Sequence, residues 1–199
     1  MATWLVVGLG NPGPTYARNR HNVGAMVVHE LGVRGSASWK AKRMAKADVA
    51  EVRVGPSGIG VPGPDAERLV LATTRTYMNE SGIPVRNLVG EYKVRPDHLI
   101  VVHDELDIDL GQIRCKFGGG DNGHNGLKSI RAMVGTGDYF RVRVGIGRPV
   151  GRMEVVDWVL TNFASSEKEM LADMVSMGAD AVESLVVNGL DKTQSTYNS

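Results

Sequence analysis

Five polar side chains have the types and positions that hydrolytic chemistry needs. Asn11, Asn79 and Asp104 lie at or just beyond the ends of hydrophobic runs, Asn125 lies in the glycine-rich "GGGDNGHNG", and His21 lies in the polar "RNRHN". A histidine can take a proton from water, and a carboxylate beside it holds the tautomer and stabilises the imidazolium. Asparagines and N–H groups at a helix N-terminus can bind an ester carbonyl and its developing oxyanion. These residue types predict hydrolysis by an activated water, with His21 and Asp104 as the pair.

Ordinary structural roles compete for the titratable residues. Asp104 opens the run "DELDID", which by spacing alone fits a solvated acidic turn equally well. His29 falls in a helical pattern, His98 precedes a strand and His103 lies inside an apolar run, so each of these has a structural interpretation. His124, in the glycine-rich segment, stays open between a site residue and a packed one.

The N-terminal glycines raise the possibility of a nucleotide site. Gly8, Gly10 and Gly13 follow the apolar run "WLVV" with the spacing of a dinucleotide-binding loop. That mechanism also needs a helix that begins in the loop and an acidic residue about 20 residues further on, at the end of a second strand. Here prolines follow the glycines, and Glu30 falls inside a helical pattern. A Rossmann oxidoreductase is therefore not favoured, and the glycines predict a sharp turn that presents Asn11.

Two further classes of function stay open on the residues alone. A metallohydrolase could use His21, Asp104 and His124, but the chain has no HxH or HExxH spacing, so we predict no metal. An RNA-binding protein without activity would need only a basic surface. The formal net charge is +1, yet eight lysines and arginines and only two aspartates fall within residues 111–152. This segment predicts a local phosphate-binding patch.

The elements that must position these residues alternate along the chain. Apolar runs and alternating patterns predict strands at 4–7, 45–54, 68–73, 98–106, 112–117 and 140–147. Helical periods predict helices at 22–31, 82–92 and 125–134, and a C-terminal helix that begins at a capping box of Ser166 and Glu169 and stops at Gly189. This order predicts an α/β fold with three α/β/α layers and a central mixed, largely parallel sheet. Ligands of such sheets bind beyond the carboxyl ends of the strands.

Length and composition set the outer bounds. With 42% hydrophobic residues, the chain of 199 residues can bury a sizeable core, and we expect one domain over residues 1–199. No run approaches the about 18 apolar residues of a membrane span, and no leader pattern opens the chain, so we expect a cytoplasmic protein. The single cysteine, Cys115, excludes an internal disulfide and alternates as an inward-facing strand residue.

Five segments carry a family resemblance. "VVGLGNPGPTYARNRHNVG", "TYMNESG", "VVHDELDIDLG" and "KFGGGDNGHNGLKSI" followed by "FRVRVGIGRP" occur in order along nearly the whole chain. Together they resemble bacterial peptidyl-tRNA hydrolase. The resemblance implies an α/β hydrolase without cofactor or metal that cleaves the ester between a peptide and the terminal ribose of tRNA. It also implies a monomer that binds the acceptor stem and terminal CCA and needs no membrane and no obligate protein partner.

The resemblance assigns roles residue by residue. The histidine of "RHN", His21, resembles the general base, and the aspartate of "HDELD", Asp104, resembles its orienting partner. The asparagines of "GNPG", "YMN" and "GHNG" are Asn11, Asn79 and Asn125, and in the family these position the peptide, the ester and the water.

Four more residues match binding positions of the family. Tyr16 resembles an aromatic residue that lines the acceptor end, and Met78 of "YMN" belongs with the substrate-binding residues. Lys116 and Arg143 resemble basic residues that grip the terminal phosphate of the tRNA. The chain departs from many relatives at Thr74, where they have proline, and in a longer loop at residues 55–65.

Overall fold

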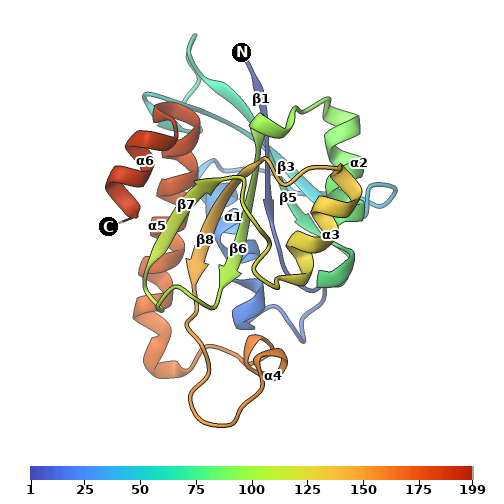
Figure 1. Ribbon diagram of the computed structural model, residues 1–199. Helices are drawn as coiled ribbons and strands as arrows, with labels where there is room; N and C mark the ends of the chain where they lie inside the picture. Colours follow the sequence, from blue (N-terminus) through green and yellow to red (C-terminus); the bar gives the residue numbers. More distant parts are fainter. Residues whose placement is uncertain (199) are drawn as a thin grey trace.

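One eight-stranded mixed sheet organises the molecule (Figure 1). The computed structural model describes residues 1–198. The strands follow the order β2-β3-β5-β1-β6-β8-β7, and β4 pairs with β3. Their bounds are β1 Thr3–Gly8, β2 Lys40–Lys42, β3 Ala47–Gly55, β4 Gly58–Ile59, β5 Glu67–Thr74, β6 Leu99–Glu105, β7 Ile113–Phe117 and β8 Phe140–Gly145. The four central strands, β5, β1, β6 and β8, are parallel, and the outer ones pair antiparallel.

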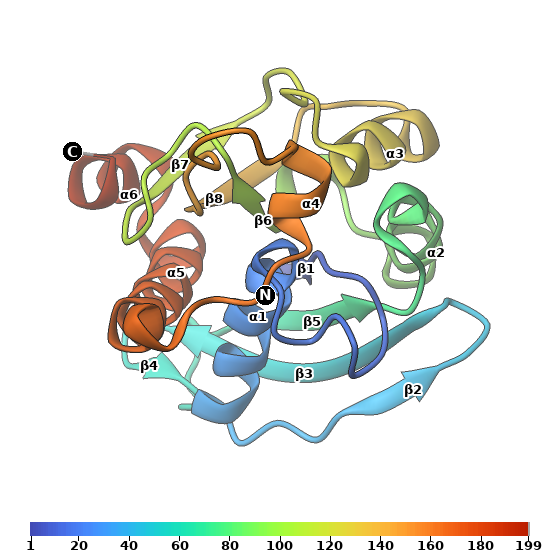
Figure 2. The same cartoon turned by 90° about the horizontal axis from the view of Figure 1, so that it is seen from below.

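Helices cover both faces of this sheet. On one face lie α1 (Val23–Arg34), α5 (Lys168–Asn188) and α6 (Leu190–Tyr197), and on the other lie α2 (Gly82–Tyr92) and α3 (Asn125–Val134). Seen from below, the short α4 (Val155–Val159) crosses the carboxyl ends of the central strands (Figure 2). Four 3₁₀ turns complete the set: Arg20–Asn22, Met78–Glu80, Pro96–His98 and Ser165–Glu167. The predicted α/β fold with a mixed sheet, parallel in its core, is confirmed.

The central strands are apolar on both sides because both sides are covered. In β1, Val6 packs in the hydrophobic core shared with α1 and α5, whereas Leu5 and Val7 pack in the core under α2 and α3. All three are fully buried. A strand buried on both faces has a continuous apolar sequence, which is why β1 and β6 could be recognised from the sequence.

Glycines at the end of β1 let the first helix begin close to the sheet. A Cβ on Gly24 would lie 2.1 Å from the carbonyl oxygen of Val102 in β6, and a Cβ on Gly8 would lie 2.4 Å from the carbonyl oxygen of Gly24. At Gly10 a Cβ would meet the side chain of Asn22 at 2.7 Å. These contacts explain the glycine spacing by close backbone approach, and they place the turn Arg20–Asn22 beside the end of β6.

Several local predictions are corrected by the structure. The predicted capping box of Ser166 and Glu169 is wrong: the N–H of Ala164 donates to the carboxylate of Glu167 at 2.7 Å, two residues earlier in the chain. The strands β2 and β4 and the helices α4 and α6 were not predicted, because each has eight residues or fewer and a weak apolar period. The loop at 55–65 contains β4, and the hydroxyl of Thr74 donates to the carbonyl of Gly10 at 3.1 Å.

The C-terminal residues pair with the edge strand β7. Asn198 accepts from the N–H of Cys115 at 2.7 Å and donates to its carbonyl at 2.8 Å, as a neighbouring strand would. Gln194 donates to the same carbonyl at 3.1 Å. The Cys115 side chain is fully buried, as predicted, and burial raises the pKa of its thiol to about 12. This cysteine is therefore a packing residue.

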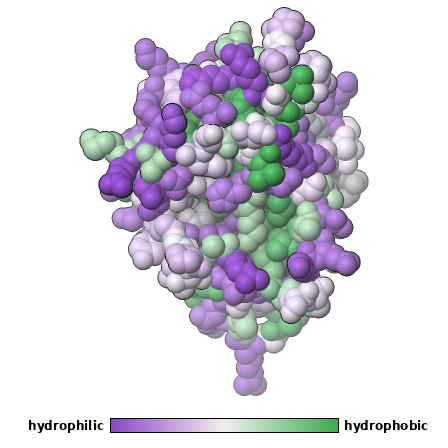
Figure 3. Space-filling model, turned by 180° about the vertical axis from the view of Figure 1, so that it is seen from behind, coloured by the Kyte–Doolittle hydropathy of each residue, from purple (hydrophilic) through white to green (hydrophobic). Residues whose placement is uncertain are grey.

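The surface is mixed in polarity. Figure 3 shows polar residues spread over much of the back face, with smaller apolar areas between them. Among residues 1–198, no helix is both long enough and apolar enough to span a membrane.

Candidate active site

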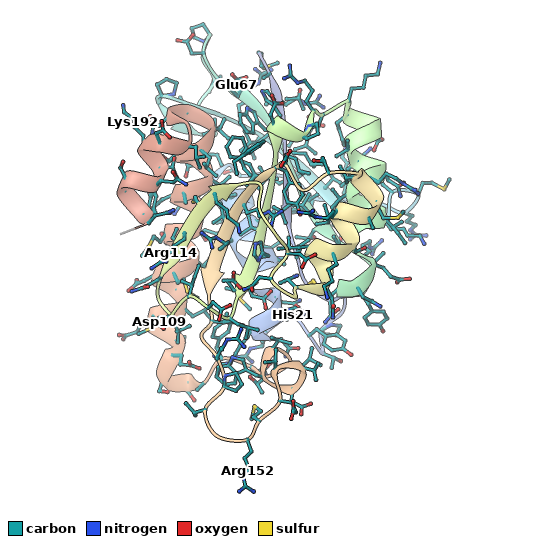
Figure 4. All side chains as sticks on the ribbon, viewed as in Figure 1. His21, Glu67, Asp109, Arg114, Arg152 and Lys192 are labelled. Atoms are coloured by element: carbon teal, nitrogen blue, oxygen red, sulfur yellow. The ribbon has the colours of Figure 1, made fainter. Side chains whose placement is uncertain are left out.

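The site lies beside the carboxyl end of β6, where residues of four elements meet. A pocket of about 130 Å³ is lined by His21 before α1, Asp104 at the end of β6, the start of α3, and Val155, Val156 and Val159 of α4. Figure 4 shows His21 in this region, between the strand ends and the lower loop. The predicted convergence at the carboxyl edge of the parallel strands therefore holds for His21, Asp104 and Asn125.

Asp104 is a buried carboxylate shared by two histidines. Its side chain is 2% exposed, and its Oδ2 lies 2.7 Å from His21 Nδ1 while its Oδ1 lies 2.8 Å from His124 Nε2. Burial alone would raise the pKa of Asp104, but the two rings outweigh it and hold that pKa far below its ordinary value. The carboxylate is therefore ionised at neutral pH, and the solvated acidic turn is excluded for this residue.

The hydrogen bonds of His124 fix its tautomer. Its Nδ1 accepts from the N–H groups of Gly126 at 3.1 Å and Leu127 at 3.3 Å, so this ring caps the N-terminus of α3. An imidazole nitrogen that accepts two N–H groups carries no proton, so Nε2 carries it and donates to Asp104. His124 is a site residue that the sequence left open, and it has no lone pair left with which to act as a base.

His21 has the opposite arrangement. Because Asp104 is ionised, the Nδ1–H of His21 donates to it, and Nε2 keeps its lone pair for a proton acceptor role. Burial lowers the pKa of His21, but the charge of Asp104 and its hydrogen bond outweigh burial, so the net pKa lies above its ordinary value. The two groups have the geometry of a base and its orienting carboxylate.

A third histidine packs behind this pair without joining it. His103 Nδ1 donates to the backbone carbonyl of Asp104 at 2.8 Å, and its ring meets that of His124 edge-on at 5.1 Å. Burial, together with the neighbouring His124, lowers the pKa of His103 to about 3. The ring stays neutral, in agreement with the structural role predicted for it.

His21, Asp104 and His124 also bring possible metal ligands within 4.8 Å of one another. The chemistry of this donor set does not fit a metal ion, because the nitrogen of His124 that faces Asp104 bears a proton. Two ligands then remain, whereas a catalytic zinc is usually held by three.

Asn11 is tied into the site by a second asparagine. Its backbone N–H donates to Asn22 Oδ1 at 3.0 Å, its carbonyl accepts from Asn22 Nδ2 at 2.9 Å, and its own Oδ1 accepts from the N–H of Met78 at 2.7 Å. Asn22 was not singled out from the sequence, although it adjoins His21 in "RHN". This pair also borders a second cavity of about 210 Å³ that reaches His29 and Asp48.

The remaining substrate-binding candidates surround this group. Met78 is buried, and its sulfur lies where a Cβ on Gly126 would meet it at 2.8 Å, so the Met78–Glu80 turn packs against the start of α3. Asn79 is exposed in the same turn, and Asn125 lines the pocket beside His21. Tyr16 is half-buried and meets Tyr77 edge-on at 6.2 Å.

The two phosphate-binding candidates lie on neighbouring strands. Lys116 on β7 and Arg143 on β8 are both partly buried. Burial first, and then mutual repulsion with neighbouring arginines, lowers the pKa of the Lys116 ammonium, and burial likewise lowers the pKa of the Arg143 guanidinium. Burial and mutual repulsion both disfavour the charged forms of Lys116 and Arg143, and a bound anion would offset that unfavourable free energy.

Arg20, the residue before His21, binds the segment around α4 that lines the pocket. Its guanidinium stacks on Trp158 at 3.9 Å and forms a two-pronged ion pair with Glu167 at 2.9 and 3.2 Å. Its Nε donates to Thr161 at 3.0 Å. The segment that carries α4 is thus fastened to the residue beside the candidate base. Sequence patterns gave no signal for this link, since its partners lie about 140 residues apart.

Comparison with known proteins agrees with this geometry. A family model described as peptidyl-tRNA hydrolase matches residues 5–199. The peptidyl-tRNA hydrolase of Streptomyces avermitilis is 55% identical over 198 residues, which cover 100% of this chain and 95% of that protein. That of Cutibacterium acnes is 50% identical over 197 residues, 99% and 98% of the two chains. A crystal structure of peptidyl-tRNA hydrolase from Acinetobacter baumannii has a TM-score of 0.83 at 31% identity, covering 97% and 93%.

Proposed function

This chain belongs to the peptidyl-tRNA hydrolase family and hydrolyses the ester bond of peptidyl-tRNA, and we propose that His21 is the base that activates the attacking water. The observation that carries this proposal is the position of Asp104 between His21 Nδ1 and the protonated Nε2 of His124. Asp104 is ionised, and its Oδ1 already accepts a hydrogen bond from the Nε2–H of His124. Its Oδ2 therefore accepts a hydrogen bond from the Nδ1–H of His21. The free Nε2 of His21 is then always the basic nitrogen.

The reaction follows from this arrangement. His21 Nε2 takes a proton from water as the oxygen attacks the ester carbonyl carbon, and the charge of Asp104 stabilises the imidazolium that forms. Collapse of the tetrahedral intermediate breaks the bond to the ribose oxygen, and His21 returns the proton to that oxygen. The products are tRNA with its terminal hydroxyl restored and a peptide carboxylic acid, which loses the second proton of the water to solvent and leaves as a carboxylate.

The asparagines supply binding and polarisation in this scheme. Asn125 lines the pocket beside His21 at the N-terminus of α3, where its amide and the helix dipole favour a developing oxyanion. Asn79 lies within the Met78–Glu80 turn and Asn11 accepts from the N–H of Met78 at its start, and both bind the peptide backbone in this scheme. Tyr16 lines the path of the acceptor end, and Met78 contributes to the substrate site from the same turn as Asn79.

Lys116 and Arg143 bind phosphate of the tRNA acceptor stem and its terminal CCA. They lie on β7 and β8, on the side of the sheet beyond β6, whose last two residues are Asp104 and Glu105, so a nucleic acid bound there would deliver its end to the pocket. Contacts to phosphate act equally in ground and transition states and therefore contribute to KM rather than kcat.

The cellular setting is part of the same proposal. We propose that residues 1–199 work as one domain, as a monomer in the cytoplasm, without a cofactor or an obligate protein partner. The two hydrophobic cores share a single sheet, and the only cysteine is buried, which suits a reducing compartment.

Hydrolysis of an N-acetylated aminoacyl-tRNA tests the mechanism. We expect release of free tRNA with and without EDTA, and a loss of about 10²-fold or more in kcat for His21→Ala with tRNA binding retained. His29→Ala, a histidine of α1 outside the pocket, is the matched control and should keep wild-type kcat. Abolition by EDTA with rescue by zinc, or near-normal turnover of His21→Ala, would refute the proposed base.

A further inference from the structure

Four cations lie side by side on one face of the sheet edge. In the antiparallel register of β7 and β8, Arg114 is opposite Arg143 and Lys116 is opposite Arg141. The residues between them pack in the core shared with α5, so all four cations face the α3 side. Like charges directly opposite one another destabilise a strand pair. Their placement therefore calls for a ligand that neutralises them.

Arg141 is the most buried of the four. It is 1% exposed, and within residues 1–198 its guanidinium hydrogen-bonds to carbonyl oxygens: Nη1 to Gly120, and Nη2 to Gly119 and Gly137, both at 2.9 Å. It also stacks on Tyr139, 4.7 Å from the ring centroid. Because these hydrogen bonds go to neutral carbonyl groups and not to a carboxylate, they leave the positive charge of Arg141 without a counter-charge beneath the glycine-rich segment.

These bonds orient the backbone of residues 118–122. In a planar trans peptide unit the C=O and the following N–H point in opposite directions. With the carbonyls of Gly119 and Gly120 turned inward to Arg141, the N–H groups of Gly120 and Asp121 point outward. Gly119 and Gly120 are exposed, and within residues 1–198 no hydrogen bond is made by either of these N–H groups.

The loop of residues 118–122 also lies next to Lys116, one of the four cations. A Cβ on Gly119 would lie 2.9 Å from Lys116 Nζ. The carboxylate of Asp121 is turned back into the loop, where it accepts from the N–H of Gly123 at 3.3 Å. Consecutive outward N–H groups beside an ammonium form the kind of concave donor cluster that binds phosphate oxygens.

We propose that residues 118–122 form a second phosphate-binding element, in which the N–H groups of Gly120 and Asp121 bind a backbone phosphate of the tRNA acceptor strand beside the one gripped by Lys116 and Arg143. Arg141 is its positioning residue: it does not touch the phosphate but holds the carbonyls of Gly119 and Gly120 inward, sharing the Gly119 carbonyl with Arg131 and binding that of Gly120 by itself among residues 1–198. The inference rests on the proposed function for the identity of the bound RNA as tRNA. The binding of a phosphate by the two N–H groups does not depend on that function.

Amide NMR of the full chain tests the proposal directly. The probes are a deacylated RNA hairpin with the sequence of an acceptor stem and CCA end, and inorganic phosphate alone. We expect the Gly120 and Asp121 amide signals to move with the hairpin, and to need far higher concentrations of inorganic phosphate. Unmoved signals at saturating hairpin, or equal sensitivity to both probes, would overturn the assignment to an RNA phosphate.

Variants at Arg141 separate its charge from its hydrogen bonds. Arg141→Met should weaken hairpin binding about tenfold, in keeping with the loss of charge-assisted hydrogen bonds, and abolish the two amide shifts. Arg141→Lys keeps the charge but lacks the planar guanidinium whose two terminal nitrogens reach the separate carbonyls, so it should restore only part of the affinity and none of the ordered shifts. Arg95→Met removes an exposed arginine that pairs with Asp97 and should change neither.

The outcome is independent of the catalytic proposal. His21→Ala should show the same two amide shifts with the hairpin whether or not it hydrolyses substrate, because this residue lies outside the loop. A His21→Ala protein that shows the shifts but still turns over substrate would refute the base and leave the phosphate element standing. Unchanged affinity and shifts in Arg141→Met would refute the phosphate element alone.

Discussion

Replacing Asp104 with asparagine tests the central geometry, because the structure dictates which way the new amide must turn. His124 Nε2 is an obligatory donor, since its Nδ1 accepts from two N–H groups of α3. The carbonyl oxygen of the introduced amide must therefore face His124, and its NH₂ must face His21. An NH₂ beside Nδ1 of His21 forces that nitrogen to accept, which moves the proton to Nε2 and removes the base.

The size of the effect follows from the lost charge. With centres roughly 4 Å apart and an effective dielectric constant of about 20, carboxylate and imidazolium attract by about 4 kcal/mol. At 1.36 kcal/mol per decade, the loss corresponds to about 10³-fold in kcat if the imidazolium is fully formed in the transition state. Packing is nearly unchanged by the swap, so the fold should hold.

The pH profile adds a second readout. Asp104 raises the pKa of His21, and the base works only when deprotonated, so the acid limb of kcat/KM should move to lower pH in the variant. Single-turnover hydrolysis of N-acetylated aminoacyl-tRNA between about pH 5 and 8 measures both quantities. Asp109→Asn, an exposed carboxylate of the same acidic run, is the control. Full activity with an unshifted acid limb in Asp104→Asn would refute the pairing.

Three further outcomes follow from the same contacts. His124→Ala should lower the unfolding free energy, measured by urea denaturation, by about 1 kcal/mol through loss of the α3 cap, and should also lower kcat. His124→Asn should restore the stability but not kcat. If His124→Asn restored stability and kcat equally, His124 would not act on catalysis through its hydrogen bond to Asp104. Lys116→Ala and Arg143→Ala should raise KM with little change in kcat, and each should flatten the slope of log affinity against log salt by about 0.7 to 0.9, whereas an unchanged slope would place the phosphate elsewhere. The unfolded chain binds a proton at His103 with a pKa near 6.5, but the folded protein does so only at about 3, so this group costs stability as pH falls through that window. Between about pH 6.5 and 5, the unfolding free energy of His103→Asn should therefore fall less steeply than that of the wild type, by at most about 1.4 kcal/mol per pH unit. Parallel plots of unfolding free energy against pH for the two proteins would refute the conclusion that the buried His103 ring stays neutral.

The sequence predicts the fold and the central pair for physical reasons. Strands buried on both faces leave continuous apolar runs, and the polar residues that end them must meet at one edge, which brought His21 and Asp104 together. The role of His124 could not be predicted, because it depends on which nitrogen caps α3. The partners of Arg20 and the stacking of Arg141 under the glycine-rich segment depend on strand register and on contacts distant in the sequence, which local patterns do not encode.

The pairing of Asn198 and Gln194 with Cys115 bears on how the molecule avoids self-association. An unpaired edge strand invites a strand from another molecule, and β7 would offer one that also carries Lys116, one of the proposed phosphate-binding residues. Side-chain amides already occupy the N–H and carbonyl of Cys115 in the middle of that strand. At the opposite margin, β2 is only three residues long and begins with the exposed Lys40, and short edge strands and edge lysines both disfavour strand addition. Both margins of the sheet therefore carry features that disfavour intermolecular strand addition.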